Sequence, residues 1–217
     1  MLFIYCCGGL GREVLLLARQ INNVKNCWST IYFVDDNFDG EEVNGAKVYT
    51  LKEVKEKYDT SKCEFIIASG EPFIRELLHN KLIENKLKIA TLIHPKVKIP
   101  EDCKIEEGCI INSGAIITAN VCLEKGCCIY NNVTLHHDVH IKSFSFISGN
   151  SILCGNVKVG KRTYIGCMVA VRNGLSIGEN SIIGMGSIVV SDIKDSGIAY
   201  GNPAKVKGEN TKKSVFK

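Results

Sequence analysis

Aliphatic residues recur at every sixth position through the second half of the chain. The series begins at Ile93 and runs without interruption to Val189, and all seventeen of its positions hold Ile, Leu or Val. A strict period of six fits neither the 3.6-residue period of an α-helix nor the alternation of a simple strand. It is typical of hexapeptide repeats, in which each hexad forms a short strand and a turn. Three hexads then complete one turn of a parallel β-helix.

The spacing also predicts the dimensions of this β-helix. Seventeen hexads make nearly six turns, and a strand spacing of about 4.8 Å gives a prism about 27 Å tall. We expect no loop to interrupt the turns between Ile93 and Val189. Known proteins with this period form left-handed β-helices, so we predict that hand, although the period alone does not fix it.

The first ninety residues follow a different pattern. Buried strands are predicted at 2–5, 31–34, 65–68 and 89–92, and helices at 12–21, 51–58 and 72–85. This alternation predicts a small parallel sheet with helices, which is a Rossmann-like α/β half-domain. Because a β-helix needs covered ends, we divide the chain into 1–92, the β-helix at 93–193, and a C-terminal cap and tail at 194–217.

A glycine-containing turn joins the first predicted strand to the first predicted helix. Gly8 and Gly9 in this turn would let a phosphate approach the backbone N–H groups at the helix start. Asp35 and Asp36 end the next strand, where they could accept hydrogen bonds from a ribose or a base. A purely structural turn is the alternative. Cys6 breaks the dinucleotide fingerprint and the domain is half-sized, so the pattern favours a nucleotide-linked small molecule over NAD.

Bulk properties narrow the function further. The net charge is +4 without a concentrated basic face, which argues against nucleic-acid binding. Several of the eleven cysteines occupy inward β-helix positions, where they act as small hydrophobes, and none has zinc-finger spacing. The apolar stretches are far shorter than a membrane span. We therefore expect a reduced, cytoplasmic protein with no metal and no membrane or nucleic-acid partner.

Three of the five histidines fall in one hexad, at His136, His137 and His140. The dipeptide His137-Asp138 suits a general base, because a carboxylate beside an imidazole fixes its tautomer and raises its basicity. Gly155 follows His137 by eighteen residues and so lies one turn further along the same face. Its N–H could stabilise the oxyanion of an acyl-transfer intermediate, or Gly155 could simply be a corner glycine. We interpret His79 and His94 as structural.

Several segments in matching order resemble a known family. They are the glycine turn, Val34-Asp35-Asp36, Leu92-Ile93-His94-Pro95, the hexads, His137-Asp138, the segment 155–160 and Tyr200-Gly201-Asn202-Pro203-Ala204-Lys205. Together they resemble the bacterial sugar O-/N-acyltransferases of the sialic-acid O-acetyltransferase and bacillosamine-type N-acetyltransferase group. The resemblance implies a homotrimer of left-handed β-helices with acetyl-CoA between neighbouring prisms and a nucleotide-linked amino sugar on the N-terminal domain.

The resemblance also implies roles for individual residues. His137 matches the catalytic base, Asp138 its carboxylate, and Gly155 the glycine near the thioester. Gly8, Gly9, Asp35 and Asp36 match the nucleotide-sugar site. Lys205 and Lys207 could meet the CoA phosphates, or they could be solvated tail residues. Three positions depart from the family pattern: Cys6 replaces a common Gly, Leu10 a frequent His, and Phe146 a second active-site His.

The sequence therefore predicts an acetyl-CoA-dependent N-acetyltransferase of a nucleotide-linked 4-amino sugar. O-acetylation of sialic acid or a related hydroxyl is an alternative that needs the same base and donor. A non-catalytic hexapeptide scaffold is an alternative of another class. It would neither bind CoA nor depend on His137.

Overall fold

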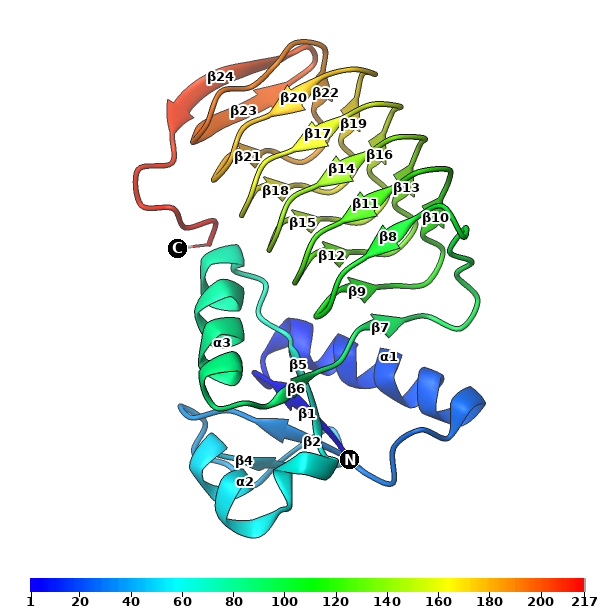
Figure 1. Cartoon of the computed structure of the whole chain (residues 1–217). Coiled ribbons are helices and arrows are strands. Elements are labelled where there is room, and N and C mark those ends of the chain that lie inside the picture. The colour runs from blue at the N-terminus through cyan, green and yellow to red at the C-terminus, as the bar shows by residue number, and fades with distance from the viewer. Residues whose placement is uncertain (217) are drawn as a thin grey trace.

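The computed structural model describes residues 1–216 as an α/β domain joined to a three-sided coil of short parallel strands (Figure 1). Lys217, the last residue of the predicted tail, lies outside the described residues. The helices are α1 (Gly9–Lys25), α2 (Leu51–Lys57) and α3 (Pro72–Glu84), with a 3₁₀ turn at Thr60–Lys62.

The N-terminal domain is built on a six-stranded sheet in the order β3-β4-β2-β1-β5-β6. Its strands are β1 (Leu2–Tyr5), β2 (Ile31–Val34), β3 (Glu42–Val43), β4 (Ala46–Tyr49), β5 (Glu64–Ile67) and β6 (Lys88–Ile89). All neighbours pair in parallel except β3 and β4, which form a hairpin. The central strand β1 is fully buried, as its apolar sequence predicts.

Local sequence explains where the helices start and stop. Thr50 and Glu53 form a reciprocal capping box at the start of α2. Pro72 occupies the first turn of α3, where its missing N–H costs nothing. Asn26 ends α1 in the left-handed conformation. The helix α1 buries Val14, Leu17 and neighbouring apolar side chains at helical spacing, so its packing stabilises it.

The second part of the chain forms three parallel sheets that share the turns of one coil. Sheet I contains β7 (Leu92–Ile93), β9 (Ile110–Ile111), β12 (Cys128–Ile129), β15 (Phe146–Ile147), β18 (Tyr164–Ile165) and β21 (Ile182–Ile183), and it is extended by β23 (Gly197–Gly201) and the antiparallel β24 (Ala204–Glu209). Sheet II contains β8 (Lys104–Ile105), β11 (Cys122–Leu123), β14 (His140–Ile141), β17 (Lys158–Val159) and β20 (Ser176–Ile177). Sheet III contains β10 (Ile116–Ile117), β13 (Thr134–Leu135), β16 (Ile152–Leu153), β19 (Ala170–Val171) and β22 (Ile188–Val189).

Each strand pairs with the strand one coil turn away, in register. Leu135, for example, lies between Ile117 and Leu153, each eighteen residues distant. The second residue of each two-residue strand points inward, and these residues form one continuous apolar core with the small residues of the corners. This arrangement is consistent with the predicted parallel β-helix. The chain passes through the sheets in the order II, I, III, so each pair of sheets meets at one corner.

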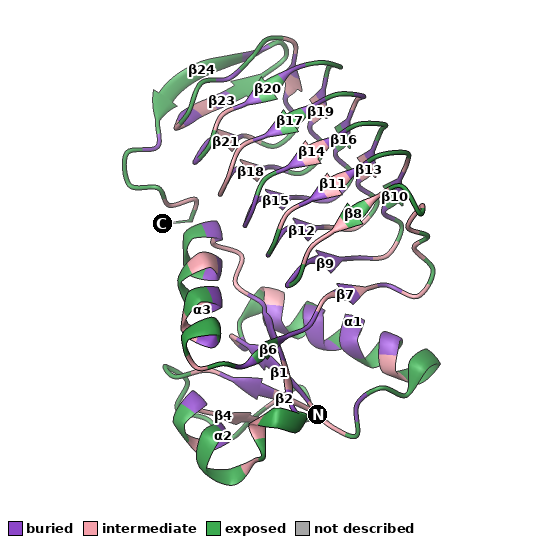
Figure 2. Ribbon diagram, viewed as in Figure 1, coloured by how far each residue is buried: buried purple, intermediate pink, exposed green. Residues whose placement is uncertain are grey.

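The N-terminal domain packs against sheet I. The outward-facing residues Ile110, Cys128 and Phe146 belong to the same buried cluster as the apolar side of α1. Helix α3 contacts the corner between sheets II and I, where Arg75 donates hydrogen bonds to the carbonyl oxygens of Gly126 (3.2 Å) and Phe144. Figure 2 shows the sheet I strands β9, β12 and β15 buried where they face the N-terminal domain, whereas β8 of sheet II is largely exposed.

Two expectations about the elements were wrong, and one hairpin was missed. The predicted strand at 89–92 is two strands, since Ile89 in β6 completes the N-terminal sheet and Leu92 in β7 starts the coil. The hexad at Ile99 forms no strand, because Pro100 lacks the N–H that Thr118 and His136 donate to the next turn at the equivalent position. The residues between β7 and β8 therefore form a loop in the first turn of the three-sided coil. The β3–β4 hairpin was not predicted.

Candidate active site

His137 and Asp138 lie at the corner between sheets III and II, between β13 and β14. The Nδ1 atom of His137 lies 2.8 Å from Oδ2 of Asp138, and Asn120 from the preceding coil turn donates to Oδ1 of Asp138 at 3.0 Å. These hydrogen bonds, that of His137 first, lower the pKa of the Asp138 carboxyl. The imidazole is therefore oriented by an ionised carboxylate, and its Nε2 atom is left for a ligand.

Gly155 occupies the same corner one turn further on, as the repeat predicts. A Cβ atom at this position would overlap the Nε2 and Cε1 atoms of His137, so only glycine leaves room for the ring in this orientation. The backbone around it is held by the hydrogen bond from the Asn156 N–H to the His137 carbonyl oxygen (2.9 Å). Among residues 1–216 the Gly155 N–H donates no hydrogen bond, and the residue is buried beside the His137 ring.

The other histidines of the hexad have different surroundings. His140 lies on sheet II, where its Nε2 atom is 2.9 Å from Glu124 Oε1, and the other oxygen of Glu124 accepts from Ser143. His136 is exposed. The two histidines therefore differ: Nε2 of His137 faces Gly155, whereas Nε2 of His140 already interacts with Glu124.

The glycine turn places the start of α1 beside the end of β1. Gly8 is the N-cap residue, and a Cβ at Gly8 or Gly9 would meet no atom within 4 Å. Gly11 is the glycine that packing requires, because a Cβ there would overlap the Cys6 carbonyl oxygen. Cys6 itself has a φ of 80°, a conformation that favours Gly, which accounts physically for a Gly preference at this position.

Asp35 and Asp36 interact with this turn and with α3. Asp35 Oδ2 accepts from the Cys7 N–H at 3.1 Å, which brings Asp35 next to the predicted phosphate turn. Asp36 accepts from the Tyr5 hydroxyl, from Lys81 Nζ (2.7 Å) and from the Leu51 N–H (2.8 Å). Burial and the Asp36 hydrogen bond raise the pKa of Tyr5 to about 12. The hydrogen bonds that Asp36 accepts thus stabilise the domain. A contact between Asp36 and a substrate stays a prediction.

A cavity of about 420 Å³ lies between the start of α1 and sheet I. We call it the sheet I cavity. It is lined by Gly9, Leu10, Glu13, Gly70, Tyr130, Phe146, Ser148, Tyr164, Cys167 and Phe216. Aromatic rings dominate this wall, and Phe146 lies between Tyr130 and Tyr164 with ring centroids 5.6 and 5.5 Å apart. Burial raises the pKa of Glu13, a carboxylate in the lining.

The lining of the sheet I cavity includes residues that the sequence did not predict. Leu10 and Phe146, the two positions where the resemblance implies histidine, both line this cavity. Glu13 and Phe216 were not predicted as site residues. Helical spacing places Glu13 outside the apolar stripe of α1, and no repeat or motif marks Phe216.

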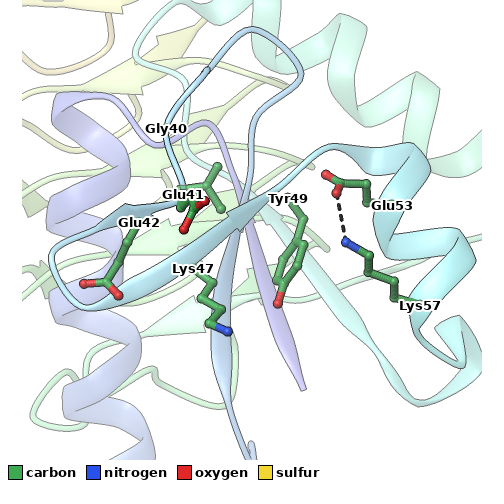
Figure 3. Close-up of a pocket in the computed structure, with 8 residues that line it drawn as sticks. Gly40, Glu41, Glu42, Lys47, Tyr49, Glu53 and Lys57 are labelled. Carbon is green, nitrogen blue, oxygen red and sulfur yellow. Dashed lines mark hydrogen bonds and ion pairs between the residues drawn. The ribbon is translucent and has the colours of Figure 1, made fainter.

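A second cavity, of about 460 Å³, lies between the β3–β4 hairpin and α2 (Figure 3). Two of its charged residues interact: Lys57 pairs with Glu53 at 2.9 Å, and Lys57 also lies 5.2 Å from the centroid of the Tyr49 ring. None of the predicted site residues is among its lining residues within 1–216. We therefore do not assign the predicted chemistry to it.

The predicted site residues fall into two groups within one chain. His137, Asp138 and Gly155 share the corner between sheets III and II. Gly9 lines the sheet I cavity and Lys205 lies exposed on β24, an extension of sheet I. Sheet I is the side of the triangular coil opposite that corner, so one chain does not bring the two groups together.

The described residues, 1–216, contain no cluster of three or more metal-binding side chains, and all eleven cysteines are free thiols. The helices in the same range are too short or too polar to cross a lipid bilayer.

Comparisons with known proteins agree with this architecture. Residues 1–82 match the family described as the PglD N-terminal domain. The acetyltransferase domain of PglB from Neisseria gonorrhoeae superposes with a TM-score of 0.88 at 27% identity over 95% of this chain and 98% of that domain, and it has also been solved with acetyl coenzyme A. PerB from Caulobacter crescentus, solved with CoA and GDP-perosamine, gives a TM-score of 0.85 at 27% identity over 95% of this chain and 97% of that one.

Sequence similarity to curated relatives is confined to a short segment. A Staphylococcus aureus protein described as an acetyltransferase is 48% identical over 50 residues, which is 23% of this chain and 25% of the relative. The match thus spans about a quarter of that relative's length. The match over residues 1–82, the two superpositions and the coil repeat all support the hexapeptide-repeat sugar acetyltransferase family, which the sequence predicted.

Proposed function

We propose that this protein transfers the acetyl group of acetyl-CoA to the amine of a nucleotide-linked 4-amino sugar. The observation that carries the proposal is the His137–Asp138 pair beneath Gly155, at one corner of the coil. The overall similarity to PerB, which was solved with CoA and GDP-perosamine, supports both the donor and the class of acceptor.

His137 is the proposed general base. Because its Nδ1 faces Asp138, Nε2 accepts the proton from the amine as the amine nitrogen attacks the thioester carbonyl carbon. The Gly155 N–H donates to the oxyanion that forms on the carbonyl oxygen. When the carbon–sulfur bond breaks, the imidazolium returns the proton to the departing thiolate, so the products are an amide and free CoA.

The acceptor is proposed to bind at the N-terminal domain. Gly8 and Gly9 at the start of α1 provide N–H groups for the nucleotide phosphates, with Asp35 and Asp36 on the nucleoside side. The amino sugar then extends into the sheet I cavity, whose size and aromatic walls suit a single sugar ring. We propose the same division of the chain as the sequence predicts: a Rossmann-like domain at 1–92, a left-handed β-helix at 93–193, and a C-terminal cap and tail at 194–217.

A homotrimer would complete the site. His137 and the sheet I cavity lie on opposite sides of one coil, so the acceptor of one copy needs the histidine of another. Sheet III offers an apolar outer surface for contact between copies, because Ile116 and Ile152 expose 56% and 42% of their surface there. The outer surface of sheet II instead carries the polar side chains of Lys104, His140 and Lys158. CoA would lie in the groove between copies, where Lys205 is proposed to meet its phosphates.

Release of free thiol from acetyl-CoA tests the proposal directly. A panel of UDP-, dTDP- and GDP-linked 4-amino sugars is compared with the corresponding hydroxyl sugars and with sialic acid. We expect turnover with an amine acceptor and a loss of about 10²- to 10⁴-fold in kcat for His137→Ala. His136→Ala, the neighbouring exposed histidine, is the matched control and should retain activity. Turnover unaffected by His137→Ala would refute the mechanism.

A further inference from the structure

Residues 210–216, which we call the closing segment, follow β24 and return to the start of α3 (Figure 1). Asn210 anchors the beginning of this segment: its N–H donates to Ser196 O at 2.7 Å and its buried amide donates to Asn180 O at 2.9 Å. The segment therefore runs from the far end of the coil to the N-terminal domain.

Glu71 holds the other end of the closing segment. Its Oε2 atom accepts from the N–H groups of Val215 (2.9 Å) and Phe216 (3.1 Å) and from the Ser214 hydroxyl (3.4 Å). Glu71 is also the N-cap residue of α3, yet its side chain makes no capping hydrogen bond to that helix. The carboxylate is used to bind a segment more than 140 residues away in the sequence.

These contacts place the ring of Phe216 in the wall of the sheet I cavity. The ring packs edge-on against Tyr164, with centroids 5.4 Å apart, and a Cβ at Gly70 would lie 3.4 Å from it. Phe216 nevertheless exposes 54% of its surface. An aromatic ring that is fixed by its backbone and open toward a cavity can pack against a ligand without further ordering.

We propose that Phe216 is a specificity-determining residue that packs against the apolar C–H face of the acceptor sugar, and that Glu71 is its positioning residue. The inference rests on the proposed function, because it assigns the sheet I cavity to the amino sugar. Phe216 and Phe146 then line that cavity as apolar walls, and Glu13 supplies the carboxylate in the lining.

Steady-state kinetics of the full chain tests this assignment. We expect Phe216→Ala to raise KM for the amino-sugar nucleotide about five- to tenfold, with KM for acetyl-CoA unchanged. Phe216→Tyr should behave like the wild type. A variant that ends at Lys213 should match Phe216→Ala, and Glu71→Gln should raise the same KM in the full chain but not in the shortened one. Phe73→Ala removes another exposed phenylalanine, on α3, and is the matched control.

The outcomes separate the two proposals. If the wild type acetylates an amino-sugar nucleotide and both Phe216→Ala and the shortened variant keep the wild-type KM, the role of Phe216 is wrong and the proposed function stands. An equal rise of both KM values would also overturn it, since that would indicate a general structural effect. If the wild type acetylates none of the acceptors, the proposed function fails and this inference fails with it.

Discussion

Oδ2 of Asp138 lies 2.8 Å from Nδ1 of His137, and the two residues are consecutive in one corner of the coil. Asp138 adopts a φ of 61°, the left-handed conformation that this corner requires. Most corners of the coil fill the equivalent position with Asn, Gly or another residue at positive φ. The repeat therefore supplies the backbone geometry that turns an ordinary corner residue back toward the preceding imidazole.

Replacing Asp138 by Asn should lower kcat while leaving KM for acetyl-CoA close to the wild-type value. The amide can donate to Nδ1, which would favour the tautomer with its proton on Nε2 and so block the proposed acceptor atom. We expect a smaller loss than for His137→Ala, because the imidazole stays in place. Asn120→Ala, which removes the hydrogen bond to the other oxygen of Asp138, should reduce kcat less than Asp138→Asn.

Gly155→Ala should reduce kcat without unfolding the protein. The new methyl group would overlap the His137 ring, which can rotate away from Asp138 because the pair is largely exposed. The measurement is kcat together with the midpoint of urea unfolding. Gly174→Ala, one turn further along the same corner, is the control: its added Cβ meets no atom within 4 Å, although its positive φ will cost some stability. A larger kcat loss in the Gly174 variant would contradict the steric explanation.

The repeat made the coil and its candidate base predictable. Because the inward residue recurs every six positions, the sequence predicted that His137 and Gly155 share one corner, and the structure places them there. The hexad at Ile99 was mispredicted for the opposite reason: its aliphatic residue keeps the period, but Pro100 lacks the N–H that would pair with the next turn. The period of six predicts which side chains face the core, but it does not predict whether each backbone N–H can donate to the next turn.

Contacts between distant segments could not be predicted in the same way. Phe216 lines the sheet I cavity while its N–H donates to Glu71, and no local pattern connects residues so far apart. Asp36 looked free to bind a ligand, yet Tyr5 and Lys81 occupy one of its oxygens. Such partners come from three separate elements, so they become visible only when the sheet and α3 are assembled.

Arg75→Met should destabilise the protein by about 3 kcal/mol. The Arg75 side chain is buried and donates to the carbonyl oxygens of Ser69, Gly126 and Phe144, which would lose their donor inside the interface between α3 and the coil. The free energy of urea unfolding measures the effect. Arg19→Met is the control, because Arg19 is exposed and makes one hydrogen bond to Asn44 O; it should change stability by less than about 0.5 kcal/mol.

Stability should fall as the pH drops below about 6.5, and His79 should account for part of the loss. Burial lowers the pKa of His79. Glu107, whose Oε1 lies 3.5 Å from Nε2, opposes this shift, and Lys125 nearby adds to it. The folded state therefore binds this proton less readily than the unfolded state does. Its stability is complete above the unfolded pKa and declines as the pH falls through it.

The unfolding midpoint of His79→Leu, measured from pH 5 to pH 8, tests this assignment. The variant should lose less stability at low pH than the wild type. His94 also has a pKa lowered by burial, so His94→Leu is measured in parallel and should remove a separate part of the slope. An unchanged slope in His79→Leu would show that His79 is protonated as easily in the folded protein as in the unfolded chain.

Ile152→Lys on sheet III should dissociate the proposed trimer and reduce acetyl transfer together. Ile116, Ile152 and Ile188 point outward from three strands of this sheet, so a lysine at the middle one would place a charge in the contact between copies. Sedimentation at micromolar concentration gives the mass, and the thiol assay gives the activity. Val24→Lys is the matched control, since Val24 exposes 69% of its surface on α1. A monomeric Ile152→Lys variant with full activity would show that one chain holds a complete site.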